Sequence, residues 1–139
     1  MDEKSQLAKE IKNYKRQISS CTEDIKELED KAELLEKAYR KKEEEEIEVE
    51  NLFTELRAKS ESIYNFGGCK IVKSMAMIID EQISAYKLND VRNCYSGTRE
   101  IIRSEINRIK EEIVEKRLEI NRLDYKISAS VKKQRALSW

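Results

Sequence analysis

The sequence predicts an all-α fold, a long antiparallel hairpin of two helices with a coiled-coil-like seam. The chain of 139 residues is 40% charged, has no proline and has only 3 glycines, a composition typical of long helices. Apolar residues recur every three or four positions in two ladders, one near each end of the chain. The only concentrated turn signal lies midway between the ladders.

The first ladder predicts a helix over about residues 3–63. Its steps alternate between four and three residues, as one face of a packed helix requires: Leu7, Ile11, Tyr14, Ile18, Cys21, Ile25, Leu28, Ala32, Leu35 and Tyr39, continued by Val49, Phe53, Leu56 and Ile63. Lys42, Glu46 and Ser60 are polar at ladder positions. Because burying Lys42 or Glu46 costs more than solvating it, we expect a weak seam around these two residues.

The turn is expected over residues 65–68, because Asn65, Gly67 and Gly68 tolerate the backbone of a reversal between helices. Its motif is Phe66-Gly67-Gly68. The simplest role of Phe66 is to plug the end of the seam. The whole chain, residues 1–139, is then one helical-hairpin domain.

The second ladder predicts a helix over about residues 69–137, with the members Ile102, Ile106, Ile109, Ile113, Ile120, Leu123 and Ile127. Six pairs drawn from the two ladders, from Leu7 with Ile127 to Leu28 with Ile106, have numbers that sum to 134. That arithmetic places the reversal near residue 67. Asn89, Asp90, Asn93 and Gly97 interrupt an earlier apolar run, so we expect a kink or interruption near residues 88–97.

The sequence gives no sign of catalysis. It has no histidine, no glycine-rich phosphate loop, no CxxC and no nucleophile elbow, so we expect no enzyme, no catalytic residues, no metal site and no cofactor. The run Glu43 to Glu46 is read as a solvated face, since consecutive helical residues point in different directions and do not converge on one ion.

The charge balance argues against nucleic acid as a partner, because 28 Lys and Arg offset 28 Asp and Glu. The longest apolar run, from Met75 to Ile79, is too short to span a membrane, and we expect no signal or anchor. The cysteines Cys21, Cys69 and Cys94 have no paired spacing. Reduced thiols and a cytoplasmic location are therefore expected.

More apolar surface is present than one partner helix can cover, and such surface usually marks a protein contact. Two occupants fit it: helices of another protein, or a second copy of the chain in a homo-oligomer. The expected partner interface consists of Leu52, Val72, Met75, Ala76, Ile79 and Ile83.

A helical hairpin that turns at aromatic-x-glycine resembles the WXG superfamily of small proteins of the type VII secretion system of Gram-positive bacteria, with Phe66-Gly67-Gly68 in place of Trp-x-Gly. In length, charged amino-terminal heptads, isoleucine-rich second helix and final Trp139, the chain is similar to the longer YwqH-like family, whose genes accompany LXG toxins.

The resemblance implies a targeting factor, a chaperone-like adaptor that binds the helical amino-terminal LXG region of a secreted toxin, alongside a second small WXG-like partner, and promotes its export. The chain would then be cytoplasmic or leave with its partner. Export signals of the family read Tyr-x-x-x-Asp/Glu; Tyr86 and Asp90 match, as do Tyr39 and Glu43, and Tyr86 with Asp90 is the expected motif. The competing function is a self-associating structural coiled coil or general helical chaperone.

Overall fold

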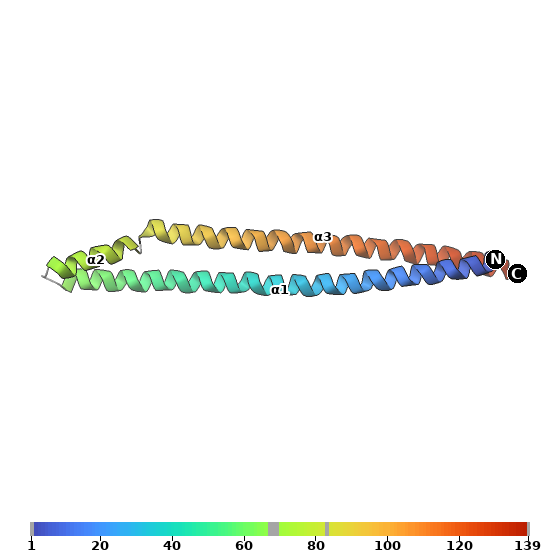
Figure 1. Ribbon diagram of the computed structural model, residues 1–139, viewed down its shortest axis with the longest axis horizontal. Coiled ribbons are helices and arrows are strands. Elements are labelled where there is room, and N and C mark those ends of the chain that lie inside the picture. Colours follow the sequence, from blue (N-terminus) through green and yellow to red (C-terminus); the bar gives the residue numbers. More distant parts are fainter. Residues whose placement is uncertain (1, 67–69, 83, 139) are drawn as a thin grey trace. The chain divides into compact units, whose positions relative to one another are not determined.

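The computed structural model describes residues 2–66, 70–82 and 84–138, and within them every regular element is a helix. The helices are α1 (Glu3–Phe66), α2 (Lys70–Gln82) and α3 (Ala85–Leu137) (Figure 1). Helix α1 is one arm of an antiparallel hairpin, and α2 followed by α3 is the other. The predicted all-α helical hairpin is therefore confirmed.

Helix α1 continues for 64 residues because no proline or glycine interrupts it. It begins with an N-cap, since the Asp2 carboxylate accepts a hydrogen bond of 2.7 Å from the Ser5 backbone N–H. A hydrogen bond from the Ser5 side chain and, second to it, the one from the Ser5 backbone N–H lower the pKa of Asp2 below its usual value. Helix α1 ends at Phe66 and α2 starts at Lys70, so the predicted turn glycines Gly67 and Gly68 lie outside the described residues.

The contacts of the chain fall into two compact units, and α1 and α3 contribute to both. Unit 1 comprises residues 1–35 and 105–139, and unit 2 comprises residues 36–104. In unit 1 the first part of α1 and the last part of α3 lie side by side and antiparallel (Figure 1). The prediction of a single domain over residues 1–139 stays a prediction.

The core of unit 1 is built by both apolar ladders, as the periodicity predicts. Its central cluster consists of Ile25, Leu28, Ala32, Ile109 and Ile113, with Leu35 and Ile120 packed against it. Ile109 and Leu123 are each only 1% exposed. The seam therefore depends on β-branched and leucine side chains spaced by three and four residues.

The pairing of the two ladders in unit 1 differs from the predicted one by about one heptad. The cross-seam contacts Asp24 with Lys116 and Tyr14 with Lys126 have numbers that sum to 140 instead of 134. In a register of 141, Leu28 lies opposite Ile113 and Ala32 opposite Ile109, and all four belong to the core cluster. The ladder repeats every seven residues, so the sequence pattern alone does not distinguish registers that differ by seven.

Unit 2 contains the second half of α1, all of α2 and the start of α3. Helix α2 approaches α1 where both side chains are small: Ser60 and Ala76 are each 1% exposed, and the Ser60 hydroxyl donates a hydrogen bond of 2.9 Å to the Ala76 carbonyl. Their numbers sum to 136, whereas those of Glu50 and Arg92 on α3 sum to 142. Helices α2 and α3 therefore meet α1 in different registers.

The second arm is divided between the end of α2 at Gln82 and the start of α3 at Ala85, whereas residues 88–97, where a kink or interruption is predicted, lie within α3. Ser84 caps the new helix, because its hydroxyl accepts a hydrogen bond of 3.4 Å from the Lys87 backbone N–H, and the Leu88 N–H donates to the Ser84 carbonyl. Ile83 lies outside the described residues. The change of register between α2 and α3 occurs at this break.

Residues 88–97 are continuous helix because their polar members lie on its solvent side. Gly97 is exposed and helical, and a Cβ built on it would meet no atom within 4 Å. The other residues that suggested an interruption are also exposed: Asn89, Asp90 and Asn93. These polar side chains lie in solvent, and the helix continues through all three residues.

Candidate protein interface

Along one edge of unit 2, charged and aromatic side chains of α1 contact basic side chains of the other arm. Tyr39, Glu46, Glu50 and Tyr64 are separated by 7, 4 and 14 residues, so they share one stripe of α1. Each contacts a basic residue of the other arm, and we call this the ionic edge: Tyr39 with Arg103, Glu46 with Arg99, Glu50 with Arg92 at 2.6 Å, and Tyr64 with Lys73, whose nitrogen lies 5.5 Å from the ring centroid.

Glu46, at a ladder position where a weak seam is predicted, forms an ion pair with Arg99 of α3. The Glu46 side chain is 15% exposed and the Arg99 side chain is 23% exposed, so both charges are largely withdrawn from water. Each compensates the other, which offsets the desolvation cost that an unpaired glutamate would carry. Lys42, the other charged ladder residue, forms its ion pair with Glu45 on its own helix at 3.0 Å.

The opposite edge of the same two helices is apolar and exposed. Ile71 and Met75 each lie two residues from Lys73, which is about 200° around α2, and Leu52 lies two residues from Glu50 on α1. We call this the apolar edge and define it by five residues with their exposed fractions: Leu52 (52%) and Ile63 (38%) of α1, and Ile71 (71%), Met75 (57%) and Ile78 (60%) of α2.

The structure divides the predicted partner interface into exposed and packed residues. Leu52 and Met75 lie on the apolar edge, whereas Val72 and Ile79 are half-buried. Ala76 is 1% exposed and packs inside the hairpin, so its placement in a partner interface is corrected. The sixth residue, Ile83, lies outside the described residues.

The predicted interface omitted three residues that the structure places on the apolar edge: Ile63, Ile71 and Ile78. A sequence signal for two of them exists, because Ile71, Met75 and Ile78 follow the steps of four and three residues that define one helical stripe. The sequence pattern alone does not distinguish this stripe from the neighbouring seam residues of α2, because they are equally apolar. Only the packing of α2 on α1 separates the two stripes.

The expected export motif lies on the surface of α3. Tyr86 is 76% exposed and Asp90 is also exposed, and residues four apart share one helix face. Both lie in the first two turns after the Ser84 cap. Of the turn motif, Phe66 is the last residue of α1, and Gly67 and Gly68 lie outside the described residues.

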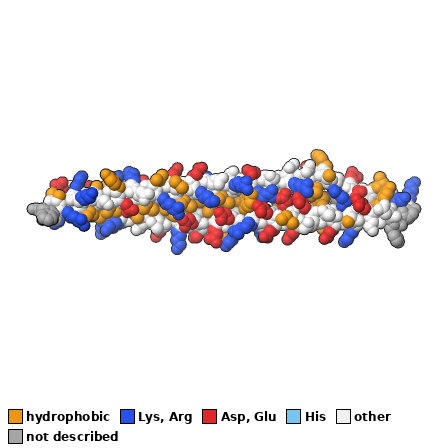
Figure 2. All heavy atoms as spheres, turned by 180° about the vertical axis from the view of Figure 1, so that it is seen from behind, with side chains coloured by type: hydrophobic (Ala, Val, Ile, Leu, Met, Phe, Trp, Pro, Cys, Tyr) orange, Lys and Arg blue, Asp and Glu red, His pale blue; other side chains and the backbone are white. Residues whose placement is uncertain are grey.

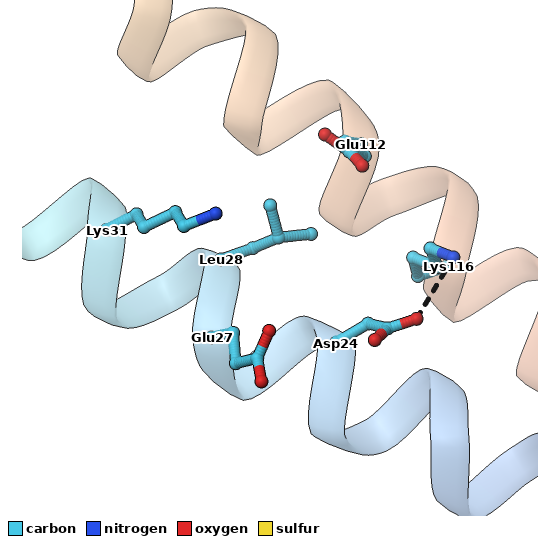
Figure 3. A pocket seen from close by; sticks show the side chains of 6 residues that line it. All are labelled: Asp24, Glu27, Leu28, Lys31, Glu112 and Lys116. Carbon is cyan, nitrogen blue, oxygen red and sulfur yellow. Dashed lines mark hydrogen bonds and ion pairs between the residues drawn. The ribbon is translucent and has the colours of Figure 1, made fainter.

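A charged groove of about 250 Å³ lies beside the seam of unit 1 (Figure 3). Asp24 of α1 and Lys116 of α3 form an ion pair of 3.2 Å across it, and this hydrogen bond raises the pKa of Lys116. The remaining lining residues are Glu27, Leu28, Lys31 and Glu112. Among the described residues, no group of three Cys, Asp or Glu side chains is arranged to hold a metal ion.

Charges of both signs are interspersed over the face seen in Figure 2, in keeping with the equal numbers of acidic and basic residues. Within residues 2–66, 70–82 and 84–138, no helix combines the length and the apolar character that crossing a membrane requires. Cys21 is a buried free thiol and Cys94 an exposed one. Cys69 and Trp139 lie outside the described residues.

Comparison of the chain with protein-family models, with curated proteins and with solved structures finds no match. The apolar edge is the clearest candidate binding surface in the described part of the chain.

Proposed function

We propose that the chain is a non-enzymatic adaptor that binds a helical segment of another protein along the apolar edge. Following the resemblance to the YwqH-like family, the bound segment is the helical amino-terminal region of an LXG toxin, and binding promotes export of the toxin by type VII secretion. The observation that supports this proposal is the group of five large apolar side chains exposed on one edge of α1 and α2.

The spacing of these side chains suits a helical partner. Ile71, Met75 and Ile78 form the same four-and-three pattern as the internal seams, so another amphipathic helix packs on them in the same way. Met75 adds an adaptable contact, because methionine is unbranched and polarizable. Burying the exposed part of each side chain is worth roughly 1 kcal/mol, so micromolar affinity requires a partner long enough to contact more of the hairpin.

Tyr86 and Asp90 are proposed as a second contact, with the secretion machinery. Their exposure leaves both side chains accessible on one face of α3. The adaptor would then bind the toxin on the apolar edge and the secretion machinery on α3, through two separate surfaces.

Coexpression with the amino-terminal region of an LXG toxin encoded beside this gene tests the proposal. We expect a soluble complex, and we expect the double substitution Met75→Glu with Ile78→Glu to weaken it at least about tenfold, because two charges would enter an apolar contact. The matched control is Val114→Glu with Leu118→Glu in unit 1, which changes side chains of similar exposure, 55% and 62%, also four or fewer residues apart.

The variant with Val114→Glu and Leu118→Glu should bind the LXG region as tightly as the original chain does. An unchanged complex with Met75→Glu and Ile78→Glu would refute the apolar edge as the binding surface. Equal loss in both double variants would show that added charge, and not the site, weakens the complex. The competing function, a self-associating structural coiled coil or general helical chaperone, predicts that the chain binds the LXG region no better than it binds unrelated helices.

A further inference from the structure

We infer that, in the absence of another protein, a second copy of this chain covers the apolar edge, with the two α2 helices packed antiparallel about a twofold axis. This inference concerns the chain alone and does not rest on the identity of any toxin. It is drawn from the distribution of charge and apolar residues along α2.

The charges of α2 change sign along the helix. Lys70 and Lys73 lie in its first half, and Asp80 and Glu81 lie in its second half. Lys73 is directed to the Tyr64 ring on the ionic edge. Lys70 and Glu81 are eleven residues apart, which is about three turns, so they share one stripe of α2.

An antiparallel copy brings these charges into complementary positions. The Lys70 end of one α2 lies beside the Glu81 end of the other, and the same contact is repeated by symmetry, as in any isologous interface. A parallel copy would instead place lysine beside lysine and glutamate beside glutamate, which is repulsive. The charge pattern therefore selects the antiparallel arrangement.

The apolar stripe of α2 is compatible with the same twofold symmetry. A twofold axis that crosses α2 close to Met75 places the stripe of Ile71, Met75 and Ile78 against its own copy, with the ends exchanged. Their alternating spacing of four and three residues allows side chains of the two helices to interdigitate. In the register of Ser60 with Ala76, Ile63 of α1 lies beside this stripe and enlarges the contact.

The interface is small, because it draws on four large side chains from each copy: Ile63, Ile71, Met75 and Ile78. So few contacts imply a weak, reversible dimer with a dissociation constant between about 10 µM and 1 mM. A helical partner with more extensive contacts would displace the second copy. The dimer would then protect an apolar surface that is otherwise exposed to non-specific association.

Sedimentation equilibrium of the purified full chain over this concentration range tests the inference. We expect the mass to rise with concentration from 16.4 kDa to twice that value. Lys70→Glu and Glu81→Lys, each alone, should weaken the dimer at least about tenfold, because each creates two like-charge contacts. The double variant Lys70→Glu with Glu81→Lys should restore it, since the exchange recreates both attractive contacts.

Circular dichroism of each variant establishes that the helices are retained. Met75→Glu with Ile78→Glu should be monomeric throughout, and Val114→Glu with Leu118→Glu should dimerise like the original chain. A constant mass of one chain at every concentration would overturn the inference, as would a dimer that is unaffected by the Met75 and Ile78 changes. A double charge exchange that dimerises no better than the single variants would overturn the antiparallel arrangement. None of these outcomes bears on toxin binding, which is measured separately.

Discussion

The Ser60 hydroxyl donates a hydrogen bond to the Ala76 carbonyl at 2.9 Å, in a contact where both residues are 1% exposed. Ser60 stands at a position of the first ladder, most of whose members are large apolar residues. Its small side chain lets α2 approach α1 closely, and its hydroxyl is satisfied by the backbone of the facing helix.

The first prediction is that filling this ladder position with an apolar residue destabilises the hairpin. Ser60→Leu should cost about 1–3 kcal/mol of unfolding free energy, because a leucine overfills the space opposite Ala76. Ser60→Ala should cost about 0.5–1.5 kcal/mol through the lost hydrogen bond. Urea denaturation followed by circular dichroism measures both values. The exposed Ser62→Leu is the control, and a stabilising Ser60→Leu would contradict the close packing.

The second prediction concerns the ion pair of Glu46 with Arg99. Replacing either residue alone with leucine should destabilise unit 2 by about 1–3 kcal/mol, because the remaining charge is largely withdrawn from water and loses its partner. Replacing both with leucine should recover most of that loss. A double-mutant cycle measured by urea denaturation gives the coupling free energy. Additive effects of the two substitutions would show that the charges do not interact.

The third prediction concerns Gly97, which lies within α3 and needs no special backbone conformation. Gly97→Ala should stabilise the chain by up to about 1 kcal/mol, because alanine favours the helix and its Cβ meets no atom within 4 Å. Thermal denaturation should show a higher midpoint. A lower midpoint would mean that Gly97 is required by a contact or bend that the helix does not show. Gly97→Pro provides the opposite extreme and should be strongly destabilising.

The fourth prediction concerns pH. Hydrogen bonds from Arg108 and Arg122 lower the pKa values of Glu105 and Glu119, so the stability they provide is present above about pH 4 and is lost as the pH falls through the lowered values. The raised pKa of Lys116 gives stability below about pH 10.4 that is lost as the pH rises through the higher value. The chain has no histidine, so the melting midpoint should be nearly constant between about pH 5.5 and 7.5.

Measuring the midpoint by circular dichroism across this range checks the pH prediction. Low salt should enlarge the losses at both extremes, because these pairs are solvent-exposed and screened by ions. A transition near neutral pH would contradict it.

The sequence pattern identifies part of the exposed apolar surface of unit 2 but not its boundary. Met75 and Leu52 were recognised as surplus apolar residues, and both are exposed. Ala76 was assigned to the same surface and is buried. Adjacent apolar stripes on a helix look alike in sequence, and which one is buried depends on the direction from which α1 approaches.

The sequence by itself determined the helices, the two ladders and the reversal near the middle, because helical periodicity and the absence of breakers are local properties. Only the tertiary structure decided which heptads pair, since a pattern that repeats every seven residues permits several registers. It also decided that Glu46 is balanced by Arg99 and that the second arm breaks at Ser84 and not near Gly97. These outcomes depend on packing between residues distant in the chain, which no local pattern contains.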